Sequence, residues 1–149
     1  MIVENLQAKP SRCEATHLVR PMSENHAAVP SVTVFAICYN HARFVIECLE
    51  SIRNQTFGTF QLIVTDDCST DESQAKIEAW LAAHRPDAIF IRHDRNVGLC
   101  ATLNEALALA TGDHISMIAT DDLWEPNKIE VQLAAMRLGA KIARFLPSG

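Results

Sequence analysis

The chain has 149 residues, of which 48% are hydrophobic and 21% charged, and its 13 basic and 18 acidic side chains give a net charge of −5. This length suits one globular domain with its own core, and the mild acidity offers no basic surface for nucleic acid. The five cysteines include no C-x-x-C pair. They indicate neither a disulfide framework nor a zinc site, so we expect reduced thiols in a cytosolic protein.

The first 30 residues are predicted to form a disordered leader. They contain three glutamates and no continuous apolar stretch, which excludes a signal peptide and a membrane anchor. Because the patterned sequence begins only at Ser31, either Met1 or Met22 could be the start of the protein. The rest of the sequence contains no run of about 18 apolar residues, the length that would predict a membrane span.

Four short runs rich in Val, Ile, Phe and Met are predicted to be strands that are covered on both faces. They begin 26 to 28 residues apart, which leaves room for one crossover helix between successive strands. This alternation is typical of an α/β fold with a largely parallel sheet. The predicted strands are Val32 to Ile37, Phe60 to Thr65, Ala88 to Arg92 and His114 to Ala119.

Helical periodicity follows the first two strands. Apolar residues between Phe44 and Ile52 fall on one face of a helix that begins after Asn40. Ser69 and Glu72 fit a capping box, which predicts a second helix with Ser69 as its N-cap.

Two further helices are predicted after the third and fourth strands. An apolar stripe from Leu99 to Ala110 predicts the first of them, with Gly112 as its left-handed C-cap. Pro126, a favoured first-turn residue, predicts the start of the last helix, which runs towards Gly139.

Polar side chains follow all four predicted strands, and in a parallel sheet these loops meet at the edge where ligands bind. Five carboxylates in one cleft would repel each other, which favours a compensating cation. Oxygen ligands without a His/Cys cluster favour Mg²⁺ or Mn²⁺, held by carboxylates together with substrate phosphates. The loop residues are Tyr39-Asn40, Asp66-Asp67, Asp94 with Asn96, and Asp121-Asp122.

The chain lacks both G-x-G-x-x-G and G-x-x-x-x-G-K-[ST], so metal rather than a glycine loop is expected to neutralise the phosphates of the ligand. Several short motifs occur once each along the chain, in this order: Val32-Thr33-Val34 through Tyr39-Asn40, Gln55-Thr56, Asp66-Asp67-Cys68-Ser69-Thr70-Asp71, Asn96-Val97-Gly98 and Asp121-Asp122-Leu123-Trp124-Glu125-Pro126-Asn127-Lys128. Together they resemble the N-terminal region of family 2 glycosyltransferases over about residues 31 to 133.

This resemblance implies a Rossmann-like GT-A fold, incomplete at its C-terminus. The glycosyltransferase-like domain would span residues 31–139, with an unmatched tail at residues 140–149. The implied activity is metal-assisted transfer of a sugar from a nucleotide diphosphate donor, most simply a UDP-type donor, to an unknown saccharide, lipid or protein acceptor. The implied setting is polysaccharide or cell-envelope synthesis in the cytoplasm or at the inner face of the membrane.

The resemblance also implies roles for the nucleotide-binding residues. Tyr39 matches the aromatic residue that packs near the base, and Asp67 matches the acidic residue that contacts the base or ribose, with Asp66 beside it. Asn96 and Gly98 match the loop that follows the third strand.

The metal-binding residues are implied in the same way. Asp121 matches the last aspartate of the family's D-x-D motif, with Asp122 next to it, and is expected to bind Mn²⁺ or Mg²⁺. Ala119 replaces the first aspartate of that motif. No residue can be assigned as the catalytic base.

Two other interpretations of the sequence remain open. The chain could be a truncated glycosyltransferase without catalytic activity. It could also be a receiver-like phosphoacceptor domain, although the first predicted strand then should end in an acidic pair rather than in Tyr39-Asn40, and a lysine should follow a later strand. His41, His84, His93 and His114 show no metal-ligand spacing and are expected to be surface or internally satisfied residues.

Overall fold

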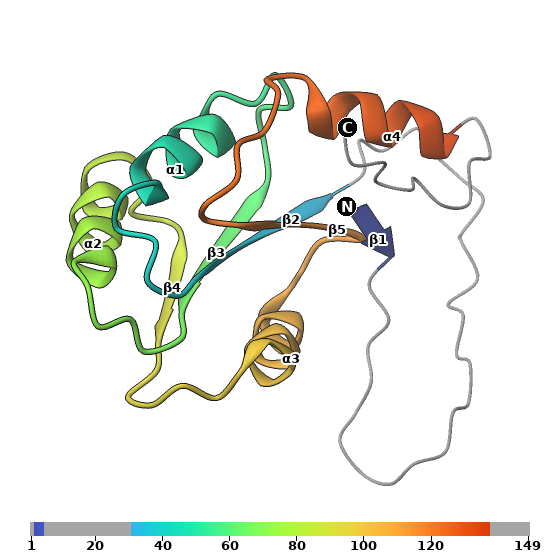
Figure 1. Ribbon diagram of the computed structural model, residues 1–149. Helices are drawn as coiled ribbons and strands as arrows, with labels where there is room; N and C mark the ends of the chain where they lie inside the picture. The colour runs from blue at the N-terminus through green and yellow to red at the C-terminus, as the bar shows by residue number, and fades with distance from the viewer. Residues whose placement is uncertain (1, 5–30, 138–149) are drawn as a thin grey trace, which may run out of the picture.

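The computed structural model describes residues 2–4 and 31–137. Within these ranges one five-stranded sheet, in the order β1-β5-β2-β3-β4, carries helices on both of its faces (Figure 1). The elements in chain order are β1 (Ile2–Glu4), β2 (Val32–Cys38), α1 (Val45–Arg53), β3 (Gln61–Asp66), α2 (Ser73–His84), β4 (Ile89–Arg92), α3 (Leu99–Leu109), β5 (His114–Ala119) and α4 (Lys128–Arg137).

Strands β2 to β5 are parallel, which confirms the predicted α/β class, and their bounds agree with the sequence prediction to within one residue. The chain winds outwards from β2 to β3 and β4, and then returns to the other side of β2 to form β5. The strand order therefore reverses at β2. In open α/β sheets, ligands bind outside the carboxyl ends of the strands at such a reversal.

Strand β1 is an addition that the sequence analysis did not predict. Ile2–Glu4 pair antiparallel with β5, whereas we expected this segment to belong to a disordered leader. The pairing satisfies backbone groups along the outer edge of β5, which would otherwise need water as their partner. Residues 5–30 of the expected leader, and residues 138–149 with the expected tail, lie outside the described part of the chain.

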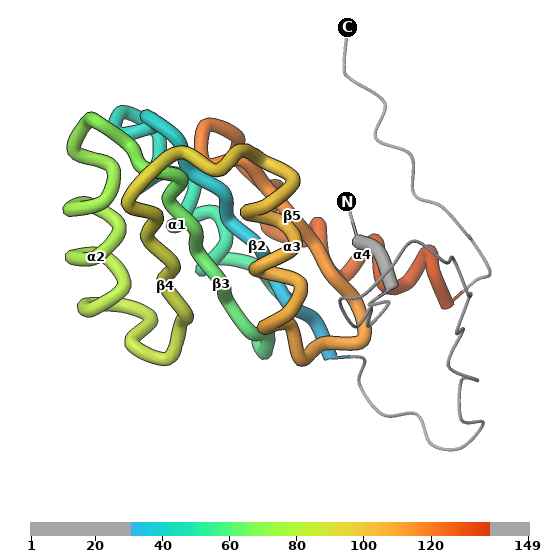
Figure 2. Tube along the Cα trace, turned by 90° about the horizontal axis from the view of Figure 1, so that it is seen from below, coloured from blue at the N-terminus to red at the C-terminus, as the bar shows by residue number. Residues whose placement is uncertain are grey.

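The two faces of the sheet carry unequal cores, because α3 lies opposite α1 and α2 (Figure 2). The larger core joins the sheet to α1, α2 and α4, and includes Leu49, Ile52, Ile77, Ile129 and Leu133. The smaller core joins the sheet to α3 through Phe35, Ile63, Ala106, Ala110 and Ile115. None of the helices in the described ranges has the length and apolar character needed to cross a membrane.

The predicted capping box at the start of the second helix is wrong. Helix α2 begins at Ser73, four residues after the expected N-cap Ser69. The Ser69 hydroxyl instead donates to Asp66 Oδ2 at 2.6 Å, and its oxygen accepts the Asn40 amide at 2.8 Å rather than a helix amide. The N-cap is Glu72, whose side chain makes no capping bond, and the Ser73 amide is instead accepted by Asp71 Oδ1 at 2.9 Å.

The predicted left-handed cap at Gly112 is also wrong. Helix α3 ends at Leu109, and its C-cap Ala110 is extended with φ −69° and ψ 131°. Gly112 is required for a different reason, since an added Cβ would lie 2.6 Å from the backbone nitrogen of Thr33. Among the described glycines, positive φ occurs at Gly98. Helix α4 begins at Lys128, two residues later than predicted, because Pro126 remains in the preceding loop.

Candidate functional site

The loops after the parallel strands lie side by side at one edge of the sheet, as the sequence predicts. Asp67 donates its amide to the carbonyl of Cys38 at 2.9 Å, and Thr120 donates its amide to the carbonyl of Ile37 at 2.9 Å. Hydrogen bonding therefore continues past the ends of β3 and β5 on either side of β2. The β2–α1, β3–α2 and β5–α4 loops consequently surround the point where the strand order reverses.

The β2–α1 loop is joined to the β3–α2 loop through Asn40, which adopts the left-handed conformation with φ 60°. Its amide donates to the Ser69 hydroxyl, and its Oδ1 accepts the Thr70 amide, each at 2.8 Å. Ala42 donates its amide to Asp71 Oδ2 at 2.9 Å. Tyr39 lies at the start of this fixed turn and is 46% exposed, so it is available to a ligand rather than part of the core.

Asp66 is completely buried at the end of β3. Its oxygens accept hydrogen bonds from the amide and the hydroxyl of Ser69 at 2.8 and 2.6 Å, and from Gln74 Nε2 at 2.7 Å. These three donors fix the turn that places Asp67. Asp66 therefore shapes the loop, and its predicted contact with a nucleotide stays a prediction.

Asp67 joins the end of β3 to the β4–α3 loop. Its Oδ1 accepts the amide of Val97 at 2.8 Å, and its Oδ2 accepts the amide of Gly98 at 2.9 Å. The positive φ of Gly98, 83°, belongs to this turn. Asn96 Nδ2 donates to the Asp67 carbonyl at 3.2 Å. The structure therefore brings together three of the predicted nucleotide-binding residues.

His93, which we expected to be a surface or internally satisfied residue, also contacts Asp67. His93 Nδ1 lies 2.8 Å from Asp67 Oδ1. Burial by itself would raise the pKa of Asp67, but hydrogen bonds from Val97, His93 and Gly98 together hold that pKa below its ordinary value. Only its position directly after the third predicted strand could have singled out His93 in the sequence.

At the end of β5, Asp121 and Asp122 are both exposed. Asp121 Oδ1 lies 3.7 Å from His41 Nδ1, and the same ring nitrogen lies 2.9 Å from the Thr120 hydroxyl. The Asp122 amide donates to the carbonyl of Ala119, which turns the chain sharply after the strand. The acidic side chains that follow β5 thus point to solvent at the reversal point.

The predicted convergence of five carboxylates in one cleft is wrong. In the described ranges, no group of three or more His, Cys, Asp or Glu side chains is arranged to hold a metal ion. Because β2 lies between β3 and β5, two strand spacings, about 10 Å, separate the ends that carry Asp66-Asp67 and Asp121-Asp122. The first pair is satisfied by hydrogen bonds from within the protein, so mutual repulsion is not the reason for a cation here.

Gln55 and Thr56 fix the far end of the β5–α4 loop. Gln55 is 6% exposed, and its Nε2 donates to the Glu125 carbonyl at 2.7 Å while its Oε1 accepts the Ile129 amide at 3.2 Å. The Thr56 amide donates to the Pro126 carbonyl at 2.7 Å. The Gln-Thr motif noted in the sequence thus has a positioning role that its sequence position alone does not reveal.

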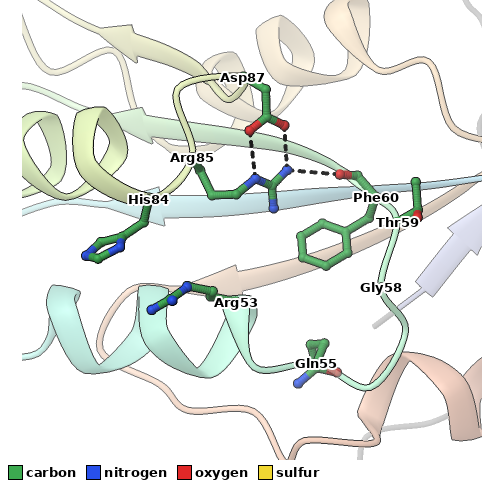
Figure 3. Close-up of a pocket in the computed structure, with 8 residues that line it drawn as sticks. All are labelled: Arg53, Gln55, Gly58, Thr59, Phe60, His84, Arg85 and Asp87. Carbon is green, nitrogen blue, oxygen red and sulfur yellow. Dashed lines mark hydrogen bonds and ion pairs between the residues drawn. The ribbon is translucent and has the colours of Figure 1, made fainter.

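A cavity of about 330 Å³ lies at the opposite, amino-terminal edge of the sheet (Figure 3). Arg85, one of its lining residues, is held by Asp87 and by the Phe60 carbonyl, and its guanidinium lies over the Phe60 ring. This cavity contains none of the predicted site residues. The candidate site is therefore the exposed loop edge rather than this cavity.

Known proteins are similar to most of the chain. The chain is 41% identical to the putative glycosyltransferase EpsE of Bacillus subtilis, with 80% of this chain and 49% of that protein covered. It is 33% identical over 105 residues to the putative colanic acid biosynthesis glycosyl transferase WcaA of Escherichia coli, with 70% and 37% covered. The chain thus spans about half the length of these relatives, or less.

Two solved structures share the fold. The mannosyltransferase PcManGT of Pyrobaculum calidifontis, in complex with GDP-Man and Mn²⁺, aligns with a TM-score of 0.61 and 30% identity over 66% of this chain and 29% of that protein. TarS of S. aureus aligns with a TM-score of 0.64 and 24% identity over 72% and 20%. The family model for glycosyl transferase family 2 matches residues 33–143, and the chain belongs to that family.

Proposed function

We propose that this chain supplies the donor-binding part of a glycosyltransferase, which moves a sugar from a nucleotide diphosphate donor to an acceptor. The observation that carries the proposal is the loop edge at the reversal of strand order. There an exposed aromatic residue, Tyr39, and exposed carboxylates, Asp121 and Asp122, flank the end of β2. A donor has a flat base and a charged diphosphate, and these residue types suit the two parts respectively.

The base and ribose would lie on the β2 and β3 side of the site. Tyr39 offers a ring that is available for stacking, because nearly half of its surface is exposed. Asp67 would contact the base or ribose through the acceptor capacity of Oδ2, because Oδ1 already contacts Val97 and His93 while Oδ2, among the described residues, accepts only the Gly98 amide. Asp66 would act indirectly, by holding the turn that positions Asp67.

The diphosphate would lie on the β5 side, with Mn²⁺ or Mg²⁺ held by Asp121 and Asp122. These exposed neighbours provide two carboxylates but no complete cage among the described residues, which fits cations that are bound jointly by one or two carboxylates and by substrate phosphates. When bound, such a cation would stabilise the negative charge of the departing nucleoside diphosphate. The Mn²⁺ and GDP-Man in the PcManGT complex support this assignment.

A UDP-type donor is our first expectation, and the GDP-Man in PcManGT makes GDP the alternative to test. A thermal-shift series with UDP, GDP and dTDP, each with and without Mn²⁺, would distinguish them, because a ligand that binds the native state raises the apparent melting temperature. The acceptor, whether saccharide, lipid or protein, and a location at the inner face of the membrane stay predictions.

The decisive test compares Asp121→Asn with Asp67→Asn by calorimetric titration with the preferred nucleotide. Asp121→Asn should weaken Mn²⁺-dependent binding at least about tenfold, about 1.4 kcal/mol, and leave metal-free binding nearly unchanged. Asp67→Asn should weaken binding under both conditions, since its proposed partner is the nucleoside. Equal losses with and without metal for Asp121→Asn would contradict the metal-binding role.

A further inference from the structure

His93 connects two carboxylates that come from different parts of the fold. Its Nδ1 lies 2.8 Å from Asp67 Oδ1, after β3, and its Nε2 lies 2.8 Å from Glu105 Oε2, on α3. The side chains of His93 and Asp67 are only 10% and 7% exposed, whereas that of Glu105 is 51% exposed. We call these three side chains the His93 bridge.

The geometry of the bridge determines the protonation state of the ring. An ionised carboxylate can only accept hydrogen bonds, so each of the two ring nitrogens must carry a proton to donate at 2.8 Å. The ring is therefore an imidazolium while both contacts persist. Burial alone would disfavour this charge, but the hydrogen bonds to Asp67 and Glu105 outweigh it and hold the pKa of His93 above its ordinary value.

The bridge acts on the loop that carries the predicted nucleotide-binding residues Asn96 and Gly98. Its partner Asp67 also accepts the amides of Val97 and Gly98, so the imidazolium and the loop amides share one carboxylate. The backbone amide of His93 adds a bond to the Asp66 carbonyl at 3.0 Å. A rotation of Asp67 would release both amides together.

We propose that His93 is a positioning residue whose protonated ring fixes Asp67 and thereby holds the β4–α3 loop, residues 93–98, in the conformation that serves donor binding. The functional part of this inference rests on the proposed function, because it assumes that Asp67 and this loop contact the nucleotide. The structural part, a proton-dependent attachment of the loop to Asp67, does not.

The charges around the ring give the direction of the pH dependence. Asp67 faces the ring from the loop after β3, and Glu105 faces it from α3. Beside His93 in the chain, Arg92 pairs with Glu78, and Asp94 and Arg95 are exposed. Because the pKa of His93 is raised on folding, the stabilisation is complete below the unfolded value of about 6.5 and is lost as the pH rises through the folded value. The loop should therefore be held more firmly at mildly acidic pH.

The attachment can be measured without any ligand. NMR titration of the His93 ring in the full chain should give a pKa above about 6.5. Amide exchange at Val97 and Gly98, corrected for intrinsic rates, should become about fivefold faster as His93 loses its proton, because a charge-assisted hydrogen bond is replaced by a neutral one.

Two variants and one control test whether the contacts of the His93 bridge cause the raised pKa and the slow amide exchange. Glu105→Gln, at an exposed position that should not affect folding, should lower the pKa of His93 and move the change in amide exchange to lower pH. His93→Gln should give fast exchange at all pH values. The control Glu78→Gln removes an exposed carboxylate that pairs with Arg92 and should leave the His93 titration unchanged.

UDP affinity supplies the functional readout, in the presence of Mn²⁺. At each pH the affinity of wild type is divided by that of Glu105→Gln, so that titration of the UDP phosphate cancels. The ratio should be near one at low pH and should rise to about threefold between the two His93 pKa values.

Three results would overturn the proposal: a His93 pKa at or below its ordinary value, a pKa that Glu105→Gln does not move, or exchange at Val97 and Gly98 that does not follow the titration. A wild-type chain that binds none of UDP, GDP and dTDP, but shows the expected titration, would refute the proposed function and still support the attachment. Nucleotide binding with an affinity ratio that does not vary with pH would refute the role of His93 in donor binding.

Discussion

One aspartate pair, Asp66 and Asp67, lies at the end of β3, and another, Asp121 and Asp122, lies just after β5, yet the two pairs have different surroundings. Asp66 and Asp67 are, as whole residues, 0% and 5% exposed. Asp66 accepts hydrogen bonds from Ser69, in the loop that follows it, and Asp67 accepts the Val97 amide of the β4–α3 loop. Asp121 and Asp122 are exposed. A buried carboxylate must be satisfied internally, whereas an exposed one is solvated until a ligand arrives. The difference indicates that the carboxylates at the end of β3 hold the loops of the site in place, whereas those after β5 are available to bind a cation that arrives with a ligand.

The largest difference between the two aspartate pairs should be in stability, when a buried carboxylate is removed. Asp66→Ala leaves three donors without their acceptor and should lower the free energy of unfolding by about 3 kcal/mol or more. Urea denaturation would measure this loss. The matched substitution Asp122→Ala, at an exposed position, should change stability by less than about 0.5 kcal/mol. Similar losses in the two variants would contradict the distinction.

The β5–α4 loop should depend on Gln55 rather than on its own acids. Gln55→Ala removes the bonds to Glu125 and Ile129 and should cost about 2 kcal/mol, because buried partners lose their hydrogen bonds. Thermal and urea denaturation would measure this. Its exposed neighbour provides the control, since Asn54→Ala should be nearly neutral. If both variants were equally stable, Gln55 would not anchor this loop.

Cation binding by the carboxylates after β5 can be strengthened by adding a third carboxylate. Ala119 is exposed, so Ala119→Asp should be accommodated and should add a third carboxylate beside Asp121 and Asp122. Mn²⁺-dependent UDP binding should tighten by about tenfold, about 1.4 kcal/mol, in calorimetric titration. Ala119→Asn keeps the shape without the charge and should have little effect. An equal gain from both substitutions would exclude a charge effect.

The smallest expected effect concerns backbone strain at the β3 end. Cys68 has φ 65°, a conformation that favours glycine. Cys68→Gly should therefore raise the free energy of unfolding by up to about 1 kcal/mol, although the greater freedom of glycine in the unfolded chain offsets part of the gain. The control Cys68→Ala removes the thiol but keeps the strain. Stabilisation by alanine rather than by glycine would assign the effect to the thiol.

Part of the site could be predicted from the sequence because it depends on order along the chain. Apolar runs at regular spacing predicted β2 to β5, and parallel strands necessarily bring their carboxyl ends to one edge. The placement of Tyr39, Asp67 and Asp121 at that edge followed directly. Family resemblance placed Asn96 and Gly98 in the loop after the third strand, but it did not predict their hydrogen bonds to Asp67, since spacing does not give the conformation of a loop.

Three-dimensional packing decided what each acid does. Asp66-Asp67 and Asp121-Asp122 look alike in the sequence, but in the folded chain Ser69, Gln74 and the β4–α3 loop supply donors to the first pair, whereas the second pair is exposed. The same holds for His93, whose partners are 26 and 12 residues away. Spacing in the chain fixes which residues reach one edge, whereas hydrogen-bond satisfaction in the folded state fixes which of them are used internally and which remain available to a ligand.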